Sequence, residues 1–265
     1  MKLWYQSLSH NAETNPYGAV LRRLIDSVAD PGTNVHMQGV SESAGIGQHY
    51  RLLAYHDTKE VIYNAVAAQR QGYDAFLIGN ISDAGLREAR ELVNIPVLGL
   101  SETCMHLACM MGAGFGLVAI SERWIPLLTE NVRRYGLERQ LVGIEPMRTS
   151  PVDLKKGIAD ADHRKNILGQ FTTAAARLLE RGAEVIIPAG GEVVVLTIEA
   201  GMYQVERAPI INGIVELIKM GEVTVKLQSL TGRFISKRGG YAPPSGDYLE
   251  RIRAFYGPHV YPGAS

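Results

Sequence analysis

The feature that most constrains the fold of this chain is a regular alternation of short apolar runs with amphipathic segments. Most of the apolar runs span four to six residues and are bounded by Gly, Pro or Asn. They are apolar on both faces, which is typical of parallel strands buried beneath helices. The predicted strands are Leu3–Gln6, Asn34–Val40, Ala75–Gly79, Val97–Leu100, Gly116–Ile120, Leu141–Ile144, Val185–Pro188 and Ile210–Ile211.

Helical patterns lie between the predicted strands. Pro16–Val28 and Asp162–Arg181 each place their apolar residues on one face, and Gly182 follows the second segment as a helix stop. This order of strands and helices predicts an α/β fold built on parallel sheets. The tail Arg233–Ser265 is basic and then rich in Gly and Pro, so we expect an irregular arm with a short helix at Tyr248–Phe255. Such an arm covers the ligand site, packs on a partner subunit or ends the chain as a mobile segment.

A weak internal repeat divides the chain. In Gly72–Asn80 and in Gly182–Gly190, a glycine ends a helix, an acid precedes a strand and small residues form the following turn. A second strand, opening with Pro96 or Pro209, follows in each half. The alternative is that the halves share only the hydrophobic pattern common to α/β proteins. We favour a duplication, which predicts two pseudo-symmetric α/β lobes, each with a parallel sheet.

The two predicted lobes also locate a ligand site. Ligands of parallel sheets bind beyond the carboxyl ends of the strands, so the turns after Gly79 and Pro188 should line one cleft between the lobes. We expect residues 1–100 together with 209–230 to form the first lobe, 101–208 the second lobe and 231–265 the C-terminal arm.

The composition excludes several classes of partner. The 27 Lys and Arg residues balance the 27 Asp and Glu residues, so no global basic face is available for nucleic acid. No apolar run reaches the ~18 residues that a membrane helix needs, and no basic segment followed by an apolar one marks a signal peptide. Two cysteines are too few for a disulfide scaffold. We therefore expect a cytoplasmic protein in a reducing compartment.

The sequence contains no motif for a metal or a cofactor. The seven histidines are scattered, with no pair at short ligand spacing. No Gly-rich phosphate loop with Lys-Ser/Thr occurs, and Gly112–Gly116 precedes a predicted strand, whereas a dinucleotide-binding loop follows one. We expect no metal and no cofactor, and a small molecule as the substrate.

Three segments carry a resemblance to a known family. They are Gly79–Leu86, Ile95–Glu102 and Gly182–Gly191, and the opening Lys2–Ser7 agrees with them. Their order and spacing resemble the aspartate/glutamate/hydantoin racemase superfamily over residues 1–230, and most of all its hydantoin and allantoin racemase branch. The resemblance implies two pseudo-symmetric lobes with the active site in the cleft between them. It also implies a homo-oligomer, which a zero net charge permits.

The resemblance implies a chemistry for which this chain lacks the usual residues. Enzymes of the family use two cysteines, one after a strand in each half, to remove and return a proton next to a carbonyl. Those positions carry Asn80 and Gly190, neither of which can exchange a proton. Cys104 and Cys109 lie five positions apart in a predicted helix and therefore on separate faces. We interpret both as structural cysteines and do not expect the two-thiol mechanism.

The turns at the expected cleft supply other candidates. Asn80, Ser82 and the backbone N–H groups around them can bind a substrate carbonyl or carboxylate. Asp83 is either a catalytic acid–base or a helix N-cap. In the opposite turn, Gly190 and Gly191 allow the backbone to approach a ligand closely.

Two more acids are candidates for proton transfer. Glu192 is either a partly desolvated general base or a first-turn acid that interacts with the helix dipole. Glu102 follows a strand at a place where related racemases carry acids that shape the site, and it also fits the first turn of a helix capped by Ser101. His106 lies four residues later on the same face, so the two form either a proton-handling pair or a structural hydrogen bond.

The remaining candidates rest on the resemblance. Related enzymes hold a substrate carboxylate or carbonyl with hydroxyl residues at the place of Ser121, and they make substrate contacts near Gln6, Ser7 and Ser9. Together these residues predict a cysteine-independent enzyme acting on a small cyclic amide or carboxylate by isomerase or lyase chemistry next to a carbonyl. One alternative is a hydrolase that opens a cyclic amide or imide with activated water. The other is a non-catalytic small-molecule-binding protein.

Overall fold

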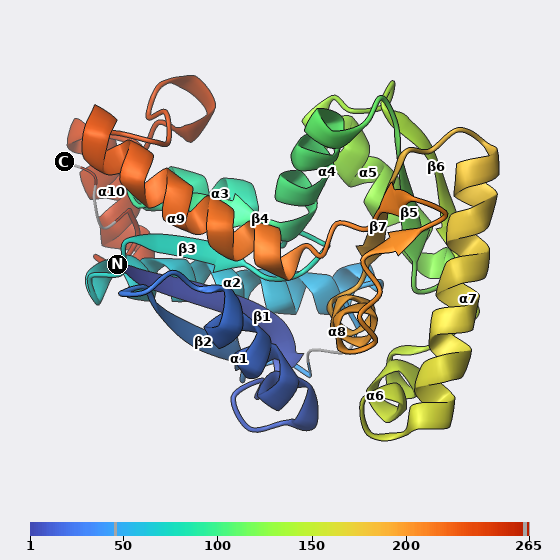
Figure 1. Ribbon diagram of the computed structural model, residues 1–265. Coiled ribbons are helices and arrows are strands. Elements are labelled where there is room, and N and C mark those ends of the chain that lie inside the picture. The colour runs from blue at the N-terminus through green and yellow to red at the C-terminus, as the bar shows by residue number, and fades with distance from the viewer. Residues whose placement is uncertain (45–46, 262–263, 265) are drawn as a thin grey trace.

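The chain folds into two α/β lobes, each built on its own parallel sheet (Figure 1). This computed structural model describes residues 1–44, 47–261 and 264. No helix within those residues combines the length and the apolar character that a membrane crossing requires. The two parallel sheets confirm the predicted fold class, while the exact domain boundaries remain a prediction.

The first sheet has four parallel strands in the order β2-β1-β3-β4. Strand β1 lies in the centre and pairs with β2 on one side and β3 on the other, so that Leu3 lies between Val35 and Ala75. The strands and helices of this lobe are β1 (Lys2–His10), α1 (Pro16–Val28), β2 (Asn34–Val40), α2 (Arg51–Arg70), β3 (Ala75–Ile78), α3 (Leu86–Leu92), β4 (Val97–Gly99) and α9 (Ile214–Thr231).

Side chains that point alternately to the two faces of the first sheet divide its core into two layers. Side chains of successive strand residues point to opposite faces, so Leu3 and Tyr5 pack in one layer with α1 and α9. Trp4 and Phe76 pack in the other layer, with α2 and α3. Because helices cover both faces, β3 and β4 are apolar throughout, as expected for buried parallel strands, whereas β1 and β2 also carry polar residues such as Gln6 and Gln38.

The second sheet has three parallel strands in the order β6-β5-β7. Helix α7 packs on one face, and α4 and α5 pack on the other. The elements of this part of the chain are α4 (Leu100–Met111), β5 (Phe115–Ala119), η1 (Glu122–Trp124), α5 (Ile125–Tyr135), β6 (Leu141–Pro146), α6 (Pro151–Ala159), α7 (Ala161–Glu180), β7 (Val185–Ala189) and α8 (Gly191–Glu199).

The segment after α8 corrects one predicted strand. Ile210 forms only an isolated parallel bridge to Ile186, at the edge of the second sheet. Before it, β8 (Gln204–Val205) and β9 (Ala208–Pro209) form a short antiparallel hairpin. Ile210–Ile211 is therefore not a full strand, because the chain leaves the sheet edge to enter α9 and return to the first lobe.

The C-terminal arm, defined here as residues 231–265, packs against the first lobe. It contains η2 (Gly239–Tyr241) and the helix α10 (Gly246–Tyr256). Ile235 is buried in the layer formed by α2 and α3, and the Lys237 ammonium donates to the carbonyls of Arg90, Glu91 and Val93 at the end of α3. The described part of the arm therefore covers the first lobe, and packing of the arm on a partner subunit stays a prediction.

Candidate active site

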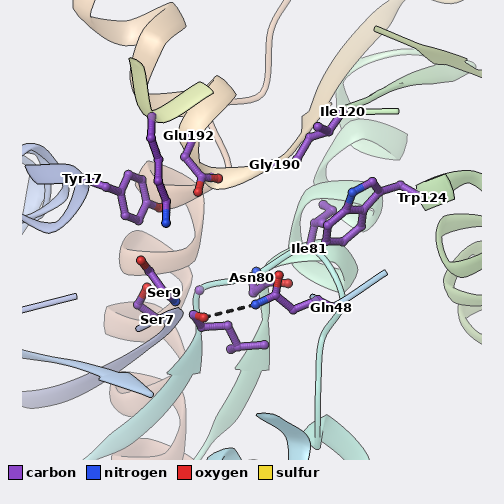
Figure 2. A pocket seen from close by; sticks show the side chains of 14 residues that line it. Ser7, Ser9, Tyr17, Gln48, Asn80, Ile81, Ile120, Trp124, Gly190 and Glu192 are labelled. Atoms are coloured by element: carbon purple, nitrogen blue, oxygen red, sulfur yellow. Dashed lines mark hydrogen bonds between the residues drawn. The ribbon is translucent and has the colours of Figure 1, made fainter. Parts of the chain in front are cut away.

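A narrow pocket of about 40 Å³ lies where the strand ends of the two sheets meet (Figure 2). The first lobe contributes residues from the ends of β1 and β3, and the second lobe contributes residues that follow β5 and β7. The lining residues are Ser7, Leu8, Ser9, Tyr17, Gln48, Gly79, Asn80, Ile81, Ile120, Trp124, Lys155, Gly190, Gly191 and Glu192.

The first lobe presents hydroxyl and amide groups to the pocket. The Ser7 Oγ accepts a hydrogen bond from the Ser9 backbone N–H at 3.2 Å, and the Ser9 Oγ accepts one from the Asn15 Nδ2 at 3.0 Å. The Asn80 Oδ1 accepts from the Ser82 N–H at 2.9 Å, which closes a turn and orients the amide. Since these oxygens act as acceptors within the protein, the hydroxyl protons and the Asn80 Nδ2 hydrogens are the groups available to a ligand.

The second lobe presents the beginning of a helix. Helix α8 begins at Gly191, directly after β7, and the Val194 N–H makes the first helical hydrogen bond, to the Gly190 carbonyl at 3.1 Å. No side chain caps this end. The first N–H groups of a helix have no partner within it, and the helix dipole adds positive potential there, so this end favours a carboxylate or an oxyanion.

Glu192 is the acid of the pocket. Figure 2 shows the Glu192 carboxylate on the side of the pocket formed by one lobe, and Ser7, Ser9 and Asn80 on the side formed by the other. Burial raises the pKa of Glu192 above the usual value for a glutamate, while its own backbone N–H and the Lys155 ammonium act in the opposite direction. A carboxyl group with a raised pKa is a stronger base than an ordinary glutamate and more readily holds a proton near neutral pH.

Four lining residues with polar or aromatic side chains were not among the sequence candidates. Tyr17 comes from α1, Gln48 from the loop before α2, Trp124 from η1 and Lys155 from α6. Burial raises the pKa of Tyr17 well above that of free tyrosine, so its hydroxyl stays protonated. No motif in the sequence marks these positions, because helix packing and loop paths bring them to the strand ends.

The structure places Asp83 beneath the pocket. Its carboxylate accepts hydrogen bonds from the N–H groups of Ser101 at 2.9 Å and Glu102 at 2.8 Å, and from the Tyr135 hydroxyl at 2.5 Å. Burial raises the pKa of Asp83 to about 7, against the lowering effect of these donors. Asp83 therefore caps the N-terminus of a helix, which was one of its two predicted roles. The helix that it caps is α4, which is distant in the chain, and not the helix that follows Asp83.

Glu102 likewise forms a structural pair. Its two carboxylate oxygens accept from the Arg90 guanidinium, one of them at 2.9 Å. His106 is exposed, and within the described residues no hydrogen bond joins it to Glu102. The structure therefore brings Glu102 to Arg90 and not to the predicted histidine, and Glu102 is not one of the residues that line the pocket.

Three other candidates lie near the pocket without lining it. The Gln6 amide is buried and donates to the carbonyls of Ser7, Gln38 and Gly39. Ser82 has a buried hydroxyl oxygen with no partner in the described part of the chain, and Ser121 precedes η1. The candidates that the structure does bring together in the pocket are Ser7, Ser9, Asn80, Gly190, Gly191 and Glu192.

Both cysteines lie in α4, outside the set of pocket residues. Cys104 is buried, which raises the pKa of its thiol well above the ordinary value, whereas Cys109 is exposed. Among residues 1–44, 47–261 and 264, no three His, Cys, Asp or Glu side chains are grouped so that they could hold a metal ion.

The fold and the pocket define a class: two-lobed α/β proteins that hold a small-molecule site between the strand ends of two parallel sheets. A family model described as Asp/Glu/Hydantoin racemase matches residues 22–221. The chain belongs to this family.

Named relatives agree with the assignment. The chain is 29% identical over 196 residues to a hydantoin racemase from Pseudomonas sp. (strain NS671), with 74% of each chain covered. It is 27% identical over 192 residues to a hydantoin racemase from Rhizobium meliloti, covering 72% of this chain and 73% of the relative.

Solved structures share the fold. An allantoin racemase from Klebsiella pneumoniae superposes with a TM-score of 0.74 at 24% identity, covering 94% of this chain and 97% of that one. An allantoin racemase from Pseudomonas fluorescens gives a TM-score of 0.76 at 22% identity, covering 93% and 98%. These values confirm the two-lobed fold.

Proposed function

We propose that this chain is an enzyme that moves a proton on the carbon next to a carbonyl of a small cyclic amide or carboxylated substrate, with Glu192 as the acid–base group in place of a thiol. The observation that carries the proposal is a carboxyl group of raised pKa inside the pocket between the two lobes. The relatives named as hydantoin and allantoin racemases support a cyclic amide as the substrate class.

The first step is removal of the proton by the Glu192 carboxylate. The electron pair of the broken C–H bond moves into the adjacent carbonyl, whose oxygen becomes negatively charged. Catalysis of this step depends on donors fixed around that oxygen. The Asn80 Nδ2, the Ser7 and Ser9 hydroxyls and the free N–H groups at the beginning of α8 are such donors.

The second step returns a proton to the same carbon. Glu192 itself can return it, and the result is then exchange with solvent without inversion. Delivery from another direction inverts the carbon, and Lys155 and Tyr17 are the other lining side chains that carry a transferable proton. In this proposal Asn80 and Gly190, at the positions where the family carries cysteines, bind the substrate and transfer no proton.

The test is proton exchange in D₂O, followed by NMR on allantoin and on 5-substituted hydantoins. We expect the signal of the ring C–H to disappear while the ring stays intact. The exchange rate of the Glu192→Gln variant should be at least about 100-fold lower than that of the unchanged chain, because a general base usually contributes a factor of this size. A matched control is Glu180→Gln, which changes an exposed acid at the end of α7 and should keep the rate within about twofold.

Three outcomes would overturn the proposal. Ring opening in place of exchange would identify a hydrolase that opens a cyclic amide. Thermal stabilisation by these ligands without any exchange would identify a binding protein. Full exchange by the Glu192→Gln variant would exclude Glu192 as the proton-transfer group.

A further inference from the structure

A second cleft of about 640 Å³ lies next to the pocket and is not used in the proposed reaction. It lies between α2, the turn before α3 and α5. Gln48 lines both the pocket and the cleft. Ile81 and Trp124 line the pocket, whereas their chain neighbours Ser82 and Arg123 line the cleft. The cleft therefore shares a wall with the pocket.

Positive charge is in excess around the cleft. Arg51, Arg87, Arg123 and Arg134 all line it. Arg51 is paired with Glu130, whereas the other three guanidinium groups form no ion pair in the described part of the chain. Arg123 instead lies 5.1 Å from the centre of the Tyr50 ring.

The acids of the cleft do not balance these arginines. The Asp83 carboxyl is buried and is taken up by the cap of α4 and by Tyr135. Glu130 is taken up by Arg51. Glu88 alone remains among the acids that line the described cleft, against three arginines. Arginine binds carboxylate and phosphate groups through paired N–H donors.

Helix ends reinforce the positive charge of the cleft, and unpartnered polar groups offer further contacts to a ligand. The N-terminal residues of α2 and α5 line the cleft, and no side chain among the described residues caps either helix. The Ser82 Oγ and the His49 Nδ1 are buried polar atoms with no partner among the described residues, and both residues line the cleft. Buried polar groups normally have a partner, and rotation of the Ser82 side chain would offer its hydroxyl to a ligand.

We propose that this arginine-lined cleft binds a small organic anion, through a carboxylate or a phosphate group, at a site separate from the pocket of Glu192. Arg123 and Arg134 are its principal contacts. Gln48 connects the two sites: its Nε2 donates to the Leu8 carbonyl at 3.2 Å in the pocket wall, while the same residue lines the cleft.

The test is isothermal titration of the full chain with inorganic phosphate, succinate and citrate, which distinguishes a phosphate from a carboxylate ligand. We expect one saturable site for at least one of them. Arg123→Gln and Arg134→Gln should each weaken the affinity at least about tenfold, the effect of losing one charge-assisted hydrogen bond. Arg139→Gln removes an exposed arginine that does not line the cleft and should leave the affinity within twofold.

Lys155→Gln separates the two sites. Lys155 lines the pocket and not the cleft, so this variant should bind the anion as the unchanged chain does. Loss of binding in Lys155→Gln alone would place the anion in the pocket and overturn the proposal. The proposal would also be overturned if Arg123→Gln and Arg134→Gln bound the anion as tightly as the unchanged chain does. The absence of saturable binding of any probe up to about 10 mM would overturn it as well. Melting temperatures of all variants show that a weaker affinity does not reflect unfolding.

Discussion

Lys155 controls how readily Glu192 becomes a base. Burial raises the pKa of the Glu192 carboxyl above the ordinary value for a glutamate, and the Lys155 ammonium acts in the opposite direction. A base must be deprotonated, so activity should rise with pH through the pKa of Glu192. In Lys155→Met the lowering effect is lost, and the acidic limb of the kcat/KM profile should move to higher pH.

Lys156→Met is the control for this prediction. Lys156 is the next residue of α6 and lies near Asp153 instead of lining the pocket. Its profile should match that of the unchanged chain. An acidic limb that stays in place, or that moves to lower pH, in Lys155→Met would show that Lys155 does not act on the catalytic carboxyl.

Alkylation tests whether a thiol takes part in the reaction. Cys109 is exposed, whereas Cys104 is buried, and both lie outside the pocket residues. Iodoacetamide should therefore modify Cys109 in the folded protein and leave turnover unchanged within about twofold, since reactivity follows thiol exposure. Mass spectrometry identifies the modified residue. Stoichiometric loss of turnover with the modification would require a thiol in the reaction.

Ligands of parallel sheets bind beyond the carboxyl ends of the strands, and this rule predicts some of the lining residues from the sequence and not others. Asn80, Gly190 and Glu192 directly follow strands that are recognisable by their apolar runs, so their place at the pocket follows from the order of the elements. Tyr17 and Lys155 reach the same pocket from helices, and the packing of those helices depends on contacts far apart in the chain. Sequence spacing alone contains no such information.

At the scale of elements, Asp83 holds the beginning of α4 and titrates with an unusual pKa. Burial raises this pKa from 3.8 to about 7. Between those values the unfolded chain releases the proton while the folded chain keeps it. The contribution of Asp83 to stability is therefore complete below about pH 4 and is lost as the pH rises through about 7.

The Asp83→Asn variant tests this contribution. It cannot titrate, so its melting temperature should fall less between pH 4 and pH 8 than that of the unchanged chain. Asp247→Asn, which changes an exposed acid in the first turn of α10, should follow the unchanged chain. Parallel curves for Asp83→Asn and the unchanged chain would show that Asp83 has an ordinary pKa.

One ammonium group makes several of the contacts that fix the arm to the first lobe. Lys237 donates to the carbonyls of Arg90, Glu91 and Val93 at 2.5, 3.0 and 2.6 Å, where α3 ends and its carbonyls need partners. Lys237→Met should lower the free energy of unfolding by roughly 1–3 kcal/mol. It should also make the arm sensitive to limited proteolysis.

Activity distinguishes the roles of the arm. No described residue of the arm lines the pocket, so Lys237→Met should keep its turnover at temperatures where it is folded. A large loss of turnover without loss of structure would mean that the arm acts on the site. Lys226→Met, on α9, changes a surface lysine near Asp30 and serves as the control.

The elements themselves were largely predictable because they depend on local pattern. The run Ala75–Ile78 is a strand, and Pro16–Val28 is a helix with the predicted bounds. Ile210–Ile211 has the same apolar character as a strand, but only Ile210 pairs, because its neighbours turn away from the sheet edge. The path of the arm also depends on long-range contacts, such as those of Ile235 and Lys237, which no periodicity indicates.

At the scale of the whole molecule, the repeat in the sequence predicts two lobes and a site between them, and it does not predict how closely they approach. One point of close approach joins Tyr17 of α1 and Gly191 at the beginning of α8. A Cβ atom at Gly191 would overlap the Tyr17 hydroxyl, whereas the ring carbon that carries this hydroxyl would lie at an ordinary contact distance of 3.5 Å. Association into a homo-oligomer remains a prediction, which light scattering can measure.

This contact predicts a coupling between the lobes. Gly191→Ala should destabilise the protein by roughly 1–3 kcal/mol, the usual cost of an extra methyl group in a packed site, although alanine favours a helix more than glycine does. Tyr17→Phe removes only the overlapping oxygen. The double variant Gly191→Ala with Tyr17→Phe should therefore recover most of the lost stability, with a coupling energy of at least about 1 kcal/mol.

Denaturant unfolding of the four proteins measures this coupling directly. If the effects of the two substitutions simply add, the lobes do not meet at this contact, because independent sites are additive. A matched alanine at Gly169, where no atom lies within 4 Å of the added Cβ, should not destabilise the protein. If Tyr17→Phe increases stability only in the presence of Gly191→Ala, the Tyr17 hydroxyl that faces Gly191 limits how closely the lobes approach. The same hydroxyl then limits the width of the pocket.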